Sequence, residues 1–459
     1  MQCSKIITVL LVFAMIIPLF TGCSRETAEE NQDMVTISVG IWPDSSDISA
    51  QKSWEIYRDT MSEEYPNITL EPAPISYSFD GIVAMAASGN LPTIFQVYFT
   101  EPQRLISNGF IADITSYAEE YGYLEGQNSE MLALASSDGK QYGIVRDAYG
   151  MALLINMRLF RSAGLVREDG TPIYPKTFDE LAETALSIHE MTGKAGFCIP
   201  TKGGHGGWQF TNIAWAFGAN FEYEDENGRL HSGLGDEPAA DAMNFIKRLR
   251  WELNVMPEQT SVGLGDYISM FAEDEVAMIL AAPDAIRNIL MQGSIGKDEL
   301  AVAPVPSRTR SVSLMGGTMY VFSSFASDEQ LDACFKLLEV MGVTPYDSET
   351  MKTALENELK IQSESGLAVL PSAISVWTSP ERAKTEESVY NNYINVDMKL
   401  FEDYYEQLDD MLAPECKINC QEMYAALDTC IYTVLSNSSC DVERLMSETA
   451  NSFEQFYYY

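Results

Sequence analysis

The spacing of hydrophobic and polar residues changes along the chain, from the pattern of a strand to that of a helix face and back again. A run of mostly β-branched residues at 35–41 predicts a strand, and the large apolar residues of 54–65 recur at the spacing of one helix face. Further patterns predict a strand at 68–72, a helix at 79–88 and a strand at 94–98. This alternation of strand and helix predicts βαβ units and therefore an α/β fold with largely parallel sheets.

The same pattern continues toward the C-terminus. Two strands, 142–145 and 151–156, are predicted on either side of a polar turn, and Thr177 and Glu180 have the spacing of a capping box. A helix at 239–253, a strand at 275–280 and a helix from Ser327 to Gly342 are also expected. From about residue 346 the chain reads as mostly helical, rich in Tyr and Leu.

The N-terminus has the pattern of an export signal. Lys5 precedes an uncharged apolar run at 6–20 that is shorter than the roughly 20 residues a membrane-spanning helix needs. Small residues and Cys23 follow at once, so residues 1–22 are expected to be a cleaved signal peptide. The polar stretch 23–33 cannot bury apolar surface and is expected to be a tether. An ordinary secretory signal followed by an incidental cysteine is the alternative.

Length and charge narrow the class further. Without residues 1–22, 437 residues remain, which is too long for one core and predicts two lobes or domains. The 29 basic residues are outnumbered by 67 acidic ones, giving a formal net charge of −38. A chain this negative repels phosphate backbones, so no nucleic-acid partner is expected.

Cysteine and histidine give no sign of a metal or cofactor. Six of the eight cysteines remain after Cys3 and Cys23 are set aside, and four of them lie between 416 and 440. Disulfides are permitted in an exported protein, but buried free thiols fit the sequence as well. The spacing is not that of a zinc ribbon, and the three histidines form no metal-binding pair. We therefore expect no metal site, no cofactor and no catalytic residues.

Two sets of short motifs resemble known families. The segment Leu19–Cys23 resembles the lipobox of bacterial lipoproteins, with Phe20 where Leu is usual. This resemblance implies a lipid on Cys23 and a location on the outer face of the cytoplasmic membrane.

A longer series of motifs resembles the extracellular solute-binding proteins of ABC importers, of the sugar-binding type related to maltose-binding protein. The matching segments cover roughly residues 35–342 in the family's order, with Thr93 where Asp is usual and Ile155 where Tyr is usual. They include Tyr65–Leu70, Ala87–Ile94, Gly109–Thr115, Gly139–Ile144, Asn156–Phe160, Pro175–Leu181, Glu275–Met278, Pro304–Pro306 and Gly316-Gly317.

The second resemblance implies the architecture and the mode of action. Two α/β lobes would be joined by crossing segments, with residues 34–147 plus 302–345 in one lobe and 148–301 plus 346–459 in the other. A small molecule, a mono- or oligosaccharide by first choice, would be captured in the cleft by hinge closure. The closed, monomeric protein would deliver it to the transmembrane subunits of a permease. Peptides, polyamines and metal complexes remain alternative ligands.

Candidate binding residues follow from the loops and from the chemistry of sugars, whose apolar faces stack on aromatic rings and whose hydroxyls bind carboxylates. Trp42 and Asp44 follow the first predicted strand, and Tyr98 ends the third, at the edge where such folds bind ligands. Each could instead serve packing or lie on the surface.

The remaining candidates lie near the expected hinge and beyond it. Arg146, Asp147 and Tyr149 occupy the predicted polar turn, where an interlobe ion pair without ligand contact is the alternative. The segment Gly203-Gly204-His205-Gly206-Gly207-Trp208 predicts a mobile loop that carries Trp208 to the ligand. Asp284 and Trp377 complete the set, the former because the family often has a cleft residue there.

Two other classes of function stay open at this point. An extracellular hydrolase or lyase needs only two carboxylates at the correct separation, and acidic residues are abundant. A surface scaffold with no small ligand is the third class. Hydrolysis of a glycan, or binding to a polymer without lobe closure, would distinguish these from a solute-binding protein.

Overall fold

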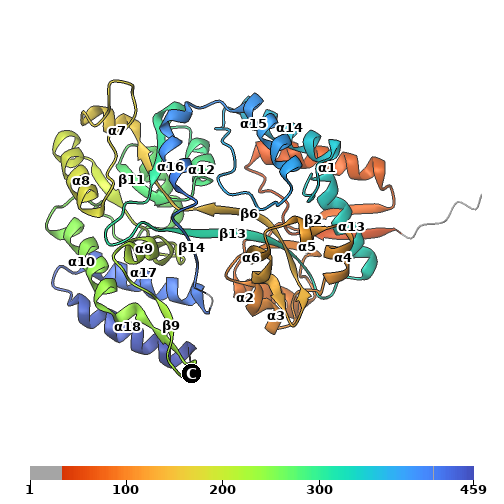
Figure 1. The fold of residues 1–459 in the computed structure, drawn as a ribbon, viewed down its shortest axis with the longest axis horizontal. Coiled ribbons are helices and arrows are strands. Elements are labelled where there is room, and N and C mark those ends of the chain that lie inside the picture. The colour runs from red at the N-terminus through yellow and green to blue at the C-terminus, as the bar shows by residue number, and fades with distance from the viewer. Residues whose placement is uncertain (1–33, 417, 459) are drawn as a thin grey trace, which may run out of the picture.

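Two α/β lobes lie side by side along the long axis of the molecule (Figure 1), in a computed structural model that describes residues 34–416 and 418–458. The predicted signal peptide 1–22 and the predicted tether 23–33, which begins with Cys23, lie outside the described residues. Two long strands, β6 (Gly143–Gly150) and β13 (Ser313–Phe322), run between the lobes through the middle of the molecule (Figure 1).

The first sheet confirms the βαβ units expected from the N-terminal pattern. Its strand order is β14-β13-β3-β1-β2, with β6 also paired to β13. The strands β1 (Val35–Val39), β2 (Ile68–Pro72) and β3 (Ile94–Tyr98) are parallel and are connected by α1 (Ile48–Glu64) and α2 (Phe79–Ser88). The short strand β14 (Leu412–Pro414) pairs with the beginning of β13.

The second sheet has the order β12-β7-β11-β8 and is formed by the strands β12 (Leu300–Pro304), β7 (Ala152–Asn156), β11 (Val276–Ala281) and β8 (Ala195–Cys198). All residues of β7, β11 and β12 are buried, because helices cover this sheet. The helices α7 (Met157–Ser162), α8 (Phe178–Thr192) and α11 (Leu264–Ala272) contact its strands, while α12 (Ala285–Met291) packs on α11, and α10 (Glu237–Trp251) packs on other helices of this lobe.

The α/β class is confirmed, and both sheets are mixed: three of the five strand pairs of the first sheet are parallel, but only one of the three pairs of the second sheet is. β7 runs antiparallel to β11 and β12, and β13 runs antiparallel to β3 and β6. The reason is that β7 and β13 each enter a lobe directly from the other lobe. They do not follow a helix of their own lobe, which is the connection that makes neighbouring strands parallel.

The polar turn predicted between 145 and 151 is wrong, because β6 continues through it. Its residues pair with β13 from Gly143↔Val321 to Gly150↔Met315, with a register shift between Thr318 and Met319. Backbone pairing with a distant strand thus overrides the local polar sequence.

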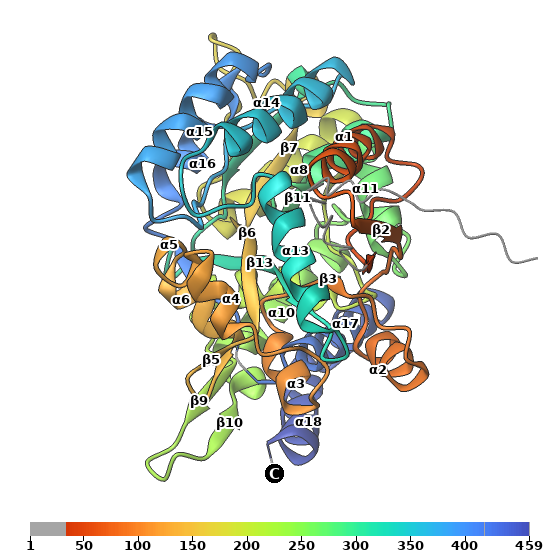
Figure 2. The same cartoon turned by 90° about the vertical axis from the view of Figure 1, so that its right-hand side faces the viewer.

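The expected division placed residues 346–459 in the second lobe. In the structure, this part of the chain is shared between the two lobes. α14 (Glu349–Glu364) contacts α1, α13 (Asp328–Val340) and α15 (Pro380–Tyr393), and Figure 2 shows α14 beside α1. Its buried residues Met351, Ala354 and Leu359 find apolar partners there. α17 (Cys420–Ser436) and α18 (Val442–Tyr457) instead pack with α10, and α17 also with α9 (His205–Ala216).

The remaining elements are short. They are α3 (Pro102–Ser107), α4 (Thr115–Glu120), α5 (Tyr123–Gly126), α6 (Ser129–Leu132), α16 (Glu402–Gln407), and the strand pairs β4 (Ser136–Ser137) with β5 (Lys140–Gln141) and β9 (Glu222–Glu224) with β10 (Leu230–Ser232).

Neither a membrane-spanning helix nor a disulfide occurs within residues 34–416 and 418–458. No helix there combines the length and the apolar character needed to cross a bilayer. The six cysteines of this part are free thiols, and all but Cys416 are buried, as small apolar side chains usually are.

Candidate ligand-binding cleft

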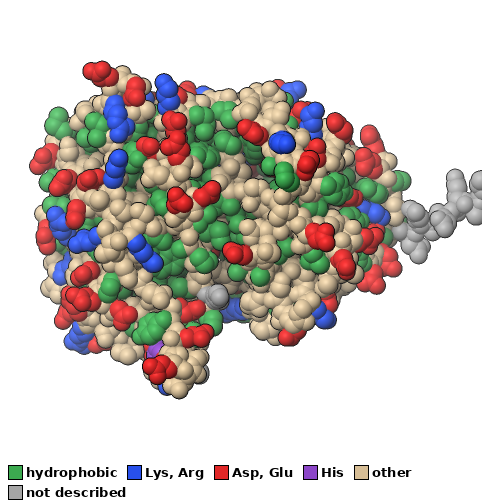
Figure 3. Space-filling view, in the orientation of Figure 1, with side chains coloured by type: hydrophobic (Ala, Val, Ile, Leu, Met, Phe, Trp, Pro, Cys, Tyr) green, Lys and Arg blue, Asp and Glu red, His purple; other side chains and the backbone are tan. Residues whose placement is uncertain are grey.

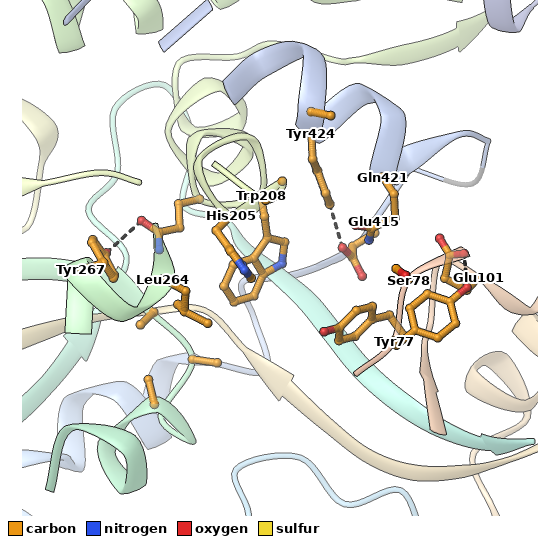
Figure 4. Close-up of a pocket in the computed structure, with 18 of the residues that line it drawn as sticks. Tyr77, Ser78, Glu101, His205, Trp208, Leu264, Tyr267, Glu415, Gln421 and Tyr424 are labelled. Carbon is orange, nitrogen blue, oxygen red and sulfur yellow. Dashed lines mark hydrogen bonds between the residues drawn. The ribbon is translucent and has the colours of Figure 1, made fainter. Parts of the chain in front are cut away.

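A cavity of about 790 Å³ lies between the two lobes. The first lobe contributes Tyr77 and the second lobe His205 and Trp208, among others (Figure 4). Tyr98 of the first lobe and Tyr149 of the crossing strand β6 also line the cavity. Cavities of this size at a lobe interface are common binding sites for small molecules. Of the predicted site residues, the structure brings together Tyr98, Tyr149, Trp208 and Asp284.

Aromatic rings form pairs on the two sides of the cavity. The rings of Tyr77 and Tyr98 meet edge to face with centroids 5.8 Å apart, and those of Tyr149 and Trp208 do so at 6.1 Å. Tyr98 is 41 % exposed, so its ring remains available to a ligand. Such rings offer flat apolar surfaces held in fixed orientations.

The position of Tyr149 depends on a glycine in the neighbouring strand. Tyr149 pairs with Gly316 of β13, and a Cβ at Gly316 would lie 2.6 Å from the Tyr149 ring. Because glycine has no side chain, the ring can lie against the backbone of β13. Gly316, in one of the segments that resemble the family, thus shapes the cleft.

Trp208 lies in the first turn of α9, and the expectation of a mobile loop at 203–208 is wrong. α9 begins at His205, and the buried carboxylate of Asp428 accepts hydrogen bonds from Gly204 N at 2.7 Å and Gly207 N at 2.8 Å. A Cβ at Gly207 would lie 2.3 Å from the carbonyl oxygen of Tyr424. The glycines therefore serve the close approach of α9 to α17 and not mobility.

Glu415, which follows β14, presents a carboxylate to the cavity. The Tyr424 hydroxyl donates a hydrogen bond of 2.7 Å to it, and in Figure 4 Glu415 lies between Trp208 and the pair Tyr77–Glu101. Desolvation within the cleft, together with the charge of Glu101, raises the pKa of Glu415 to about 7, although the hydrogen bond from Tyr424 acts to lower it.

Two further carboxylates are similarly perturbed. Desolvation, followed by the nearby charge of Asp147, raises the pKa of Asp284 to about 6. Glu101 is buried and accepts a hydrogen bond from the Tyr77 hydroxyl. Its burial raises its pKa, although Tyr77 and Arg104 act in the opposite direction.

Polar contacts join the two lobes beside the cavity. Arg104 of α3 forms an ion pair with Glu422 of α17, and Gln421 Nε2 donates to Thr100 Oγ1 at 2.9 Å. A second ion pair joins Asp47, before α1, to Arg287 of α12. These contacts require the lobes to be close together, so the structure represents a closed arrangement.

Arg146 and Asp147 lie next to the cavity but do not line it. Asp147 Oδ1 accepts from Thr318 Oγ1 at 2.8 Å and from Thr318 N at 3.1 Å, and Arg146 Nη1 lies 3.1 Å from Asp147 Oδ2. Their contacts are therefore with each other and with β13, at the register shift of the crossing strands.

Trp42, Asp44 and Trp377 lie outside the cavity. The ring of Trp42 contacts that of Trp54 at 4.8 Å in the core of the first lobe, and Asp44 bonds to Ser46 at 2.6 Å on the surface. Trp377 packs against Tyr123 at 6.3 Å and lies under the guanidinium of Arg382 at 4.2 Å. Packing accounts for both tryptophans.

Several lining residues were not predicted from the sequence, among them Tyr77, Glu101, Tyr267, Glu415 and Tyr424. Tyr77 precedes the capping residue Ser78 of α2, and Glu101 precedes Pro102 at the start of α3, so a search of helix starts would have found both. Glu415 and Tyr424 lie in the C-terminal segment, where no motif distinguishes them.

The surface shows how differently charge and apolar groups are distributed. On the face drawn in Figure 3, acidic side chains are scattered over both lobes, and hydrophobic side chains gather along the middle between them. Within the described part of the chain, no group of three or more His, Cys, Asp or Glu side chains is arranged to hold a metal ion.

Residues 57–354 match the family described as bacterial extracellular solute-binding protein. The chain belongs to this family. Among curated relatives, it is 25 % identical over 227 residues to a protein of Brucella abortus (strain 2308) named as a binding protein, a stretch that covers 47 % of this chain and 53 % of that protein. It is 26 % identical over 189 residues to the polygalacturonan/rhamnogalacturonan-binding protein YtcQ of Bacillus subtilis (strain 168), covering 39 % of this chain and 36 % of that one. The matches thus span about half or less of the relatives' length.

Solved structures share the whole two-lobe fold. An ABC transporter solute-binding protein of Thermotoga lettingae bound with α-D-tagatose aligns with a TM-score of 0.70 at 18 % identity, covering 92 % of this chain and 99 % of that one. The GacH receptor of Streptomyces glaucescens, solved unliganded and with acarbose, aligns at 0.68 and 18 % identity over 92 % and 98 % of the two chains. UgpB of Mycobacterium tuberculosis with glycerophosphocholine aligns at 0.69 and 12 % identity over the same shares. The likeness confirms the two-lobe fold with a cleft between the lobes.

Proposed function

We propose that this protein is the substrate-binding component of an ABC importer and that its ligand is a carbohydrate. The carrying observation is that aromatic rings from both lobes and from a crossing strand face one cavity together with hydrogen-bonding carboxylates. Rings stack on the apolar faces of sugars, while carboxylates and amides bind the hydroxyls around them. Sugar complexes among the structural relatives support this proposal.

The mechanism is hinge closure about β6 and β13. A ligand that contacts both Tyr98 and Trp208 makes all of its contacts only when the lobes are together, so its binding shifts the population toward the closed form. The closed monomer would then be recognised by the transmembrane subunits of the permease. The chain binds without transforming its ligand, in keeping with its family of binding proteins.

A thermal-shift screen tests the carbohydrate assignment. Mono- and oligosaccharides are compared with peptides and polyamines. A ligand at 100 times its dissociation constant stabilises the folded protein by about 2.7 kcal/mol, which raises the Tm by a few degrees in a chain of this size. A saturable shift with one class of sugar is expected. A shift with a peptide alone would keep the fold but overturn the carbohydrate assignment.

We further propose that Cys23 carries a lipid that anchors the protein to the outer face of the cytoplasmic membrane. Cys23 follows an apolar run and the small residue Gly22, as in a lipobox. Cys23→Ala is expected to release the protein into the medium, which fractionation and immunoblotting would show. Retention of the variant in the membrane fraction would contradict the anchor.

A further inference from the structure

The cavity is lined by more acidic than basic side chains. Its lining includes the carboxylates of Asp80, Glu101, Asp284, Glu415 and Glu422. Among the described residues that line it, Arg104 and His205 are the groups that could carry a positive charge. The imbalance lies inside the binding site, so it bears directly on the ligand.

Neither of these two groups neutralises the central carboxylates. Arg104 is paired with Glu422, and its guanidinium lies 3.4 Å from the centroid of the Phe79 ring. Desolvation lowers the pKa of His205, so its ring is neutral at neutral pH. Within the described residues, no cation forms an ion pair with Asp284 or Glu415.

We propose that the ligand is an amino-bearing oligosaccharide, whose protonated amine is held by Glu415 and Asp284 beside the rings of Tyr98, Tyr149 and Trp208. The inference rests on the proposed function and names the substrate class of the same site. An ammonium group would compensate carboxylates that form no ion pair within the described residues, whereas a sugar acid would add like charge to the cluster.

The aromatic rings suit the same ligand. A cation within about 6 Å of a ring centroid is attracted to the ring face, and the pyranose faces of the sugar can stack on the same rings. Tyr149 and Trp208, 6.1 Å apart, lie on one side, and Tyr98 is exposed to the cavity on the other. A polyamine would satisfy the carboxylates and could place a cation over a ring, but it has no pyranose face to stack on these rings.

Proton linkage gives the inference an independent signature. The titratable groups that interact with Glu415 are Cys416 next to it in the chain, Tyr424 and Cys420 of α17, Glu101 before α3 and Tyr149 of β6. None of these supplies a positive charge. A bound ammonium would therefore lower the pKa of Glu415 from about 7. At a pH at which the free amine is already fully protonated, the proton that Glu415 loses on binding passes to the buffer.

The test is isothermal titration calorimetry of the full chain at physiological ionic strength. Glucosamine tetramers with free amines are compared with N-acetylated tetramers of the same length, with galacturonate tetramers and with spermidine. The free-amine tetramer is expected to bind with one-to-one stoichiometry and at least about tenfold more tightly than its acetylated counterpart. Its heat should vary between buffers of different ionisation enthalpy, which reports the released protons.

Two variants distinguish an effect of the cavity carboxylates from an effect of the negative charge of the whole surface. Glu415→Gln should lower the ratio of the affinities for the free-amine and the acetylated tetramer, and it should reduce the proton release. Asp241→Asn, which removes an exposed carboxylate from α10, should leave the preference as it is.

The outcomes distinguish this inference from the proposed function. Equal or tighter binding of the acetylated or galacturonate tetramer would overturn the inference and leave the carbohydrate assignment standing. Binding of spermidine alone, with no saccharide bound, would overturn both, because the carbohydrate assignment would fail first.

Discussion

Asp47 and Arg287 face each other across the cleft and form a two-atom contact between the lobes. Arg287 Nη2 lies 2.7 Å from Asp47 Oδ2, and Arg287 Nε lies 3.2 Å from the same oxygen. Asp47 also accepts from Ala50 N at 2.9 Å at the start of α1. Although desolvation acts to raise it, these hydrogen bonds hold the pKa of Asp47 below its ordinary value.

Because this pair exists only when the lobes are together, it should favour the closed form. Arg287→Gln and Asp47→Asn are each expected to weaken ligand affinity a few-fold and to enlarge the unliganded molecule measured by small-angle X-ray scattering. The double variant should lose less than the sum of the single losses, with a coupling of roughly 0.5–1 kcal/mol.

Arg58→Gln provides a control for this pair, since Arg58 pairs with Asp59 on the exposed side of α1 within one lobe. It should change neither affinity nor molecular size. Additive losses in the Asp47 and Arg287 cycle would show that their contact does not contribute to closure.

Trp208→Ala should weaken ligand binding at least about tenfold, because the indole forms part of the aromatic wall. Trp208 is only partly buried, so the Tm of the empty protein should change little. Calorimetry of binding and of unfolding measures both effects. The matched variant Trp251→Ala removes an indole that is 41 % exposed on α10, away from the cavity, and should leave affinity intact. Equal affinities of Trp208→Ala and the parent would remove this ring from the site.

Gly207→Ala should destabilise the second lobe, since the new Cβ would lie 2.3 Å from the Tyr424 carbonyl oxygen. Relieving that overlap requires α9 and α17 to separate, and overpacking of this kind costs about 1–3 kcal/mol. Gly265→Ala, in the first turn of α11, meets nothing within 4 Å and should be neutral or stabilising. Denaturant unfolding of both variants gives the comparison. A Gly207→Ala protein as stable as Gly265→Ala would contradict the close packing described for α9.

The dependence of stability on pH should change in Glu415→Gln. Because the pKa of Glu415 rises from its ordinary 4.5 to about 7 in the folded protein, the folded state binds this proton more tightly than the unfolded chain. The contribution to stability is therefore complete below about pH 4.5 and is lost as the pH rises through 7. Relative to the parent, Glu415→Gln should gain in Tm across this range.

Glu101 faces Glu415 and also has a raised pKa, so Glu101→Gln should be measured beside it. If the difference in Tm between the parent and Glu415→Gln stays constant from pH 4 to pH 8, Glu415 does not titrate in this pH range.

The order of the first five elements, and the bounds of three of them, could be predicted from local pattern alone. The strand at 68–72, the helix at 79–88 and the strand at 94–98 have the predicted bounds in the structure. These segments are bounded by strong local signals, such as the capping Ser78 and the left-handed Gly89 of α2. Tyr98 was found for the same reason, because it ends a strand at the edge of the sheet where ligands bind.

The remainder depends on residues far apart in the chain. Gly203–Gly207 reads as a loop until the capping carboxylate of Asp428 and the backbone of Tyr424 are brought against it. Arg146 and Asp147 read as a turn until β13 pairs with them. Glu415 enters the cavity only because β14 joins the first sheet beside β13. No local sequence pattern predicts these contacts.

The place of β13 in the first sheet also determines when that sheet can form during export. β13 joins β3 to β14 and pairs with β6, yet it follows β3 only after the whole second sheet has been laid down in the chain. When the N-terminal strands β1, β2 and β3 leave a translocation channel, β13 has not yet entered it. The first sheet therefore stays incomplete until β13, and after it β14 (Leu412–Pro414), have left the channel. Pairings this distant form slowly, which keeps the chain in the unfolded state that threading through a channel requires.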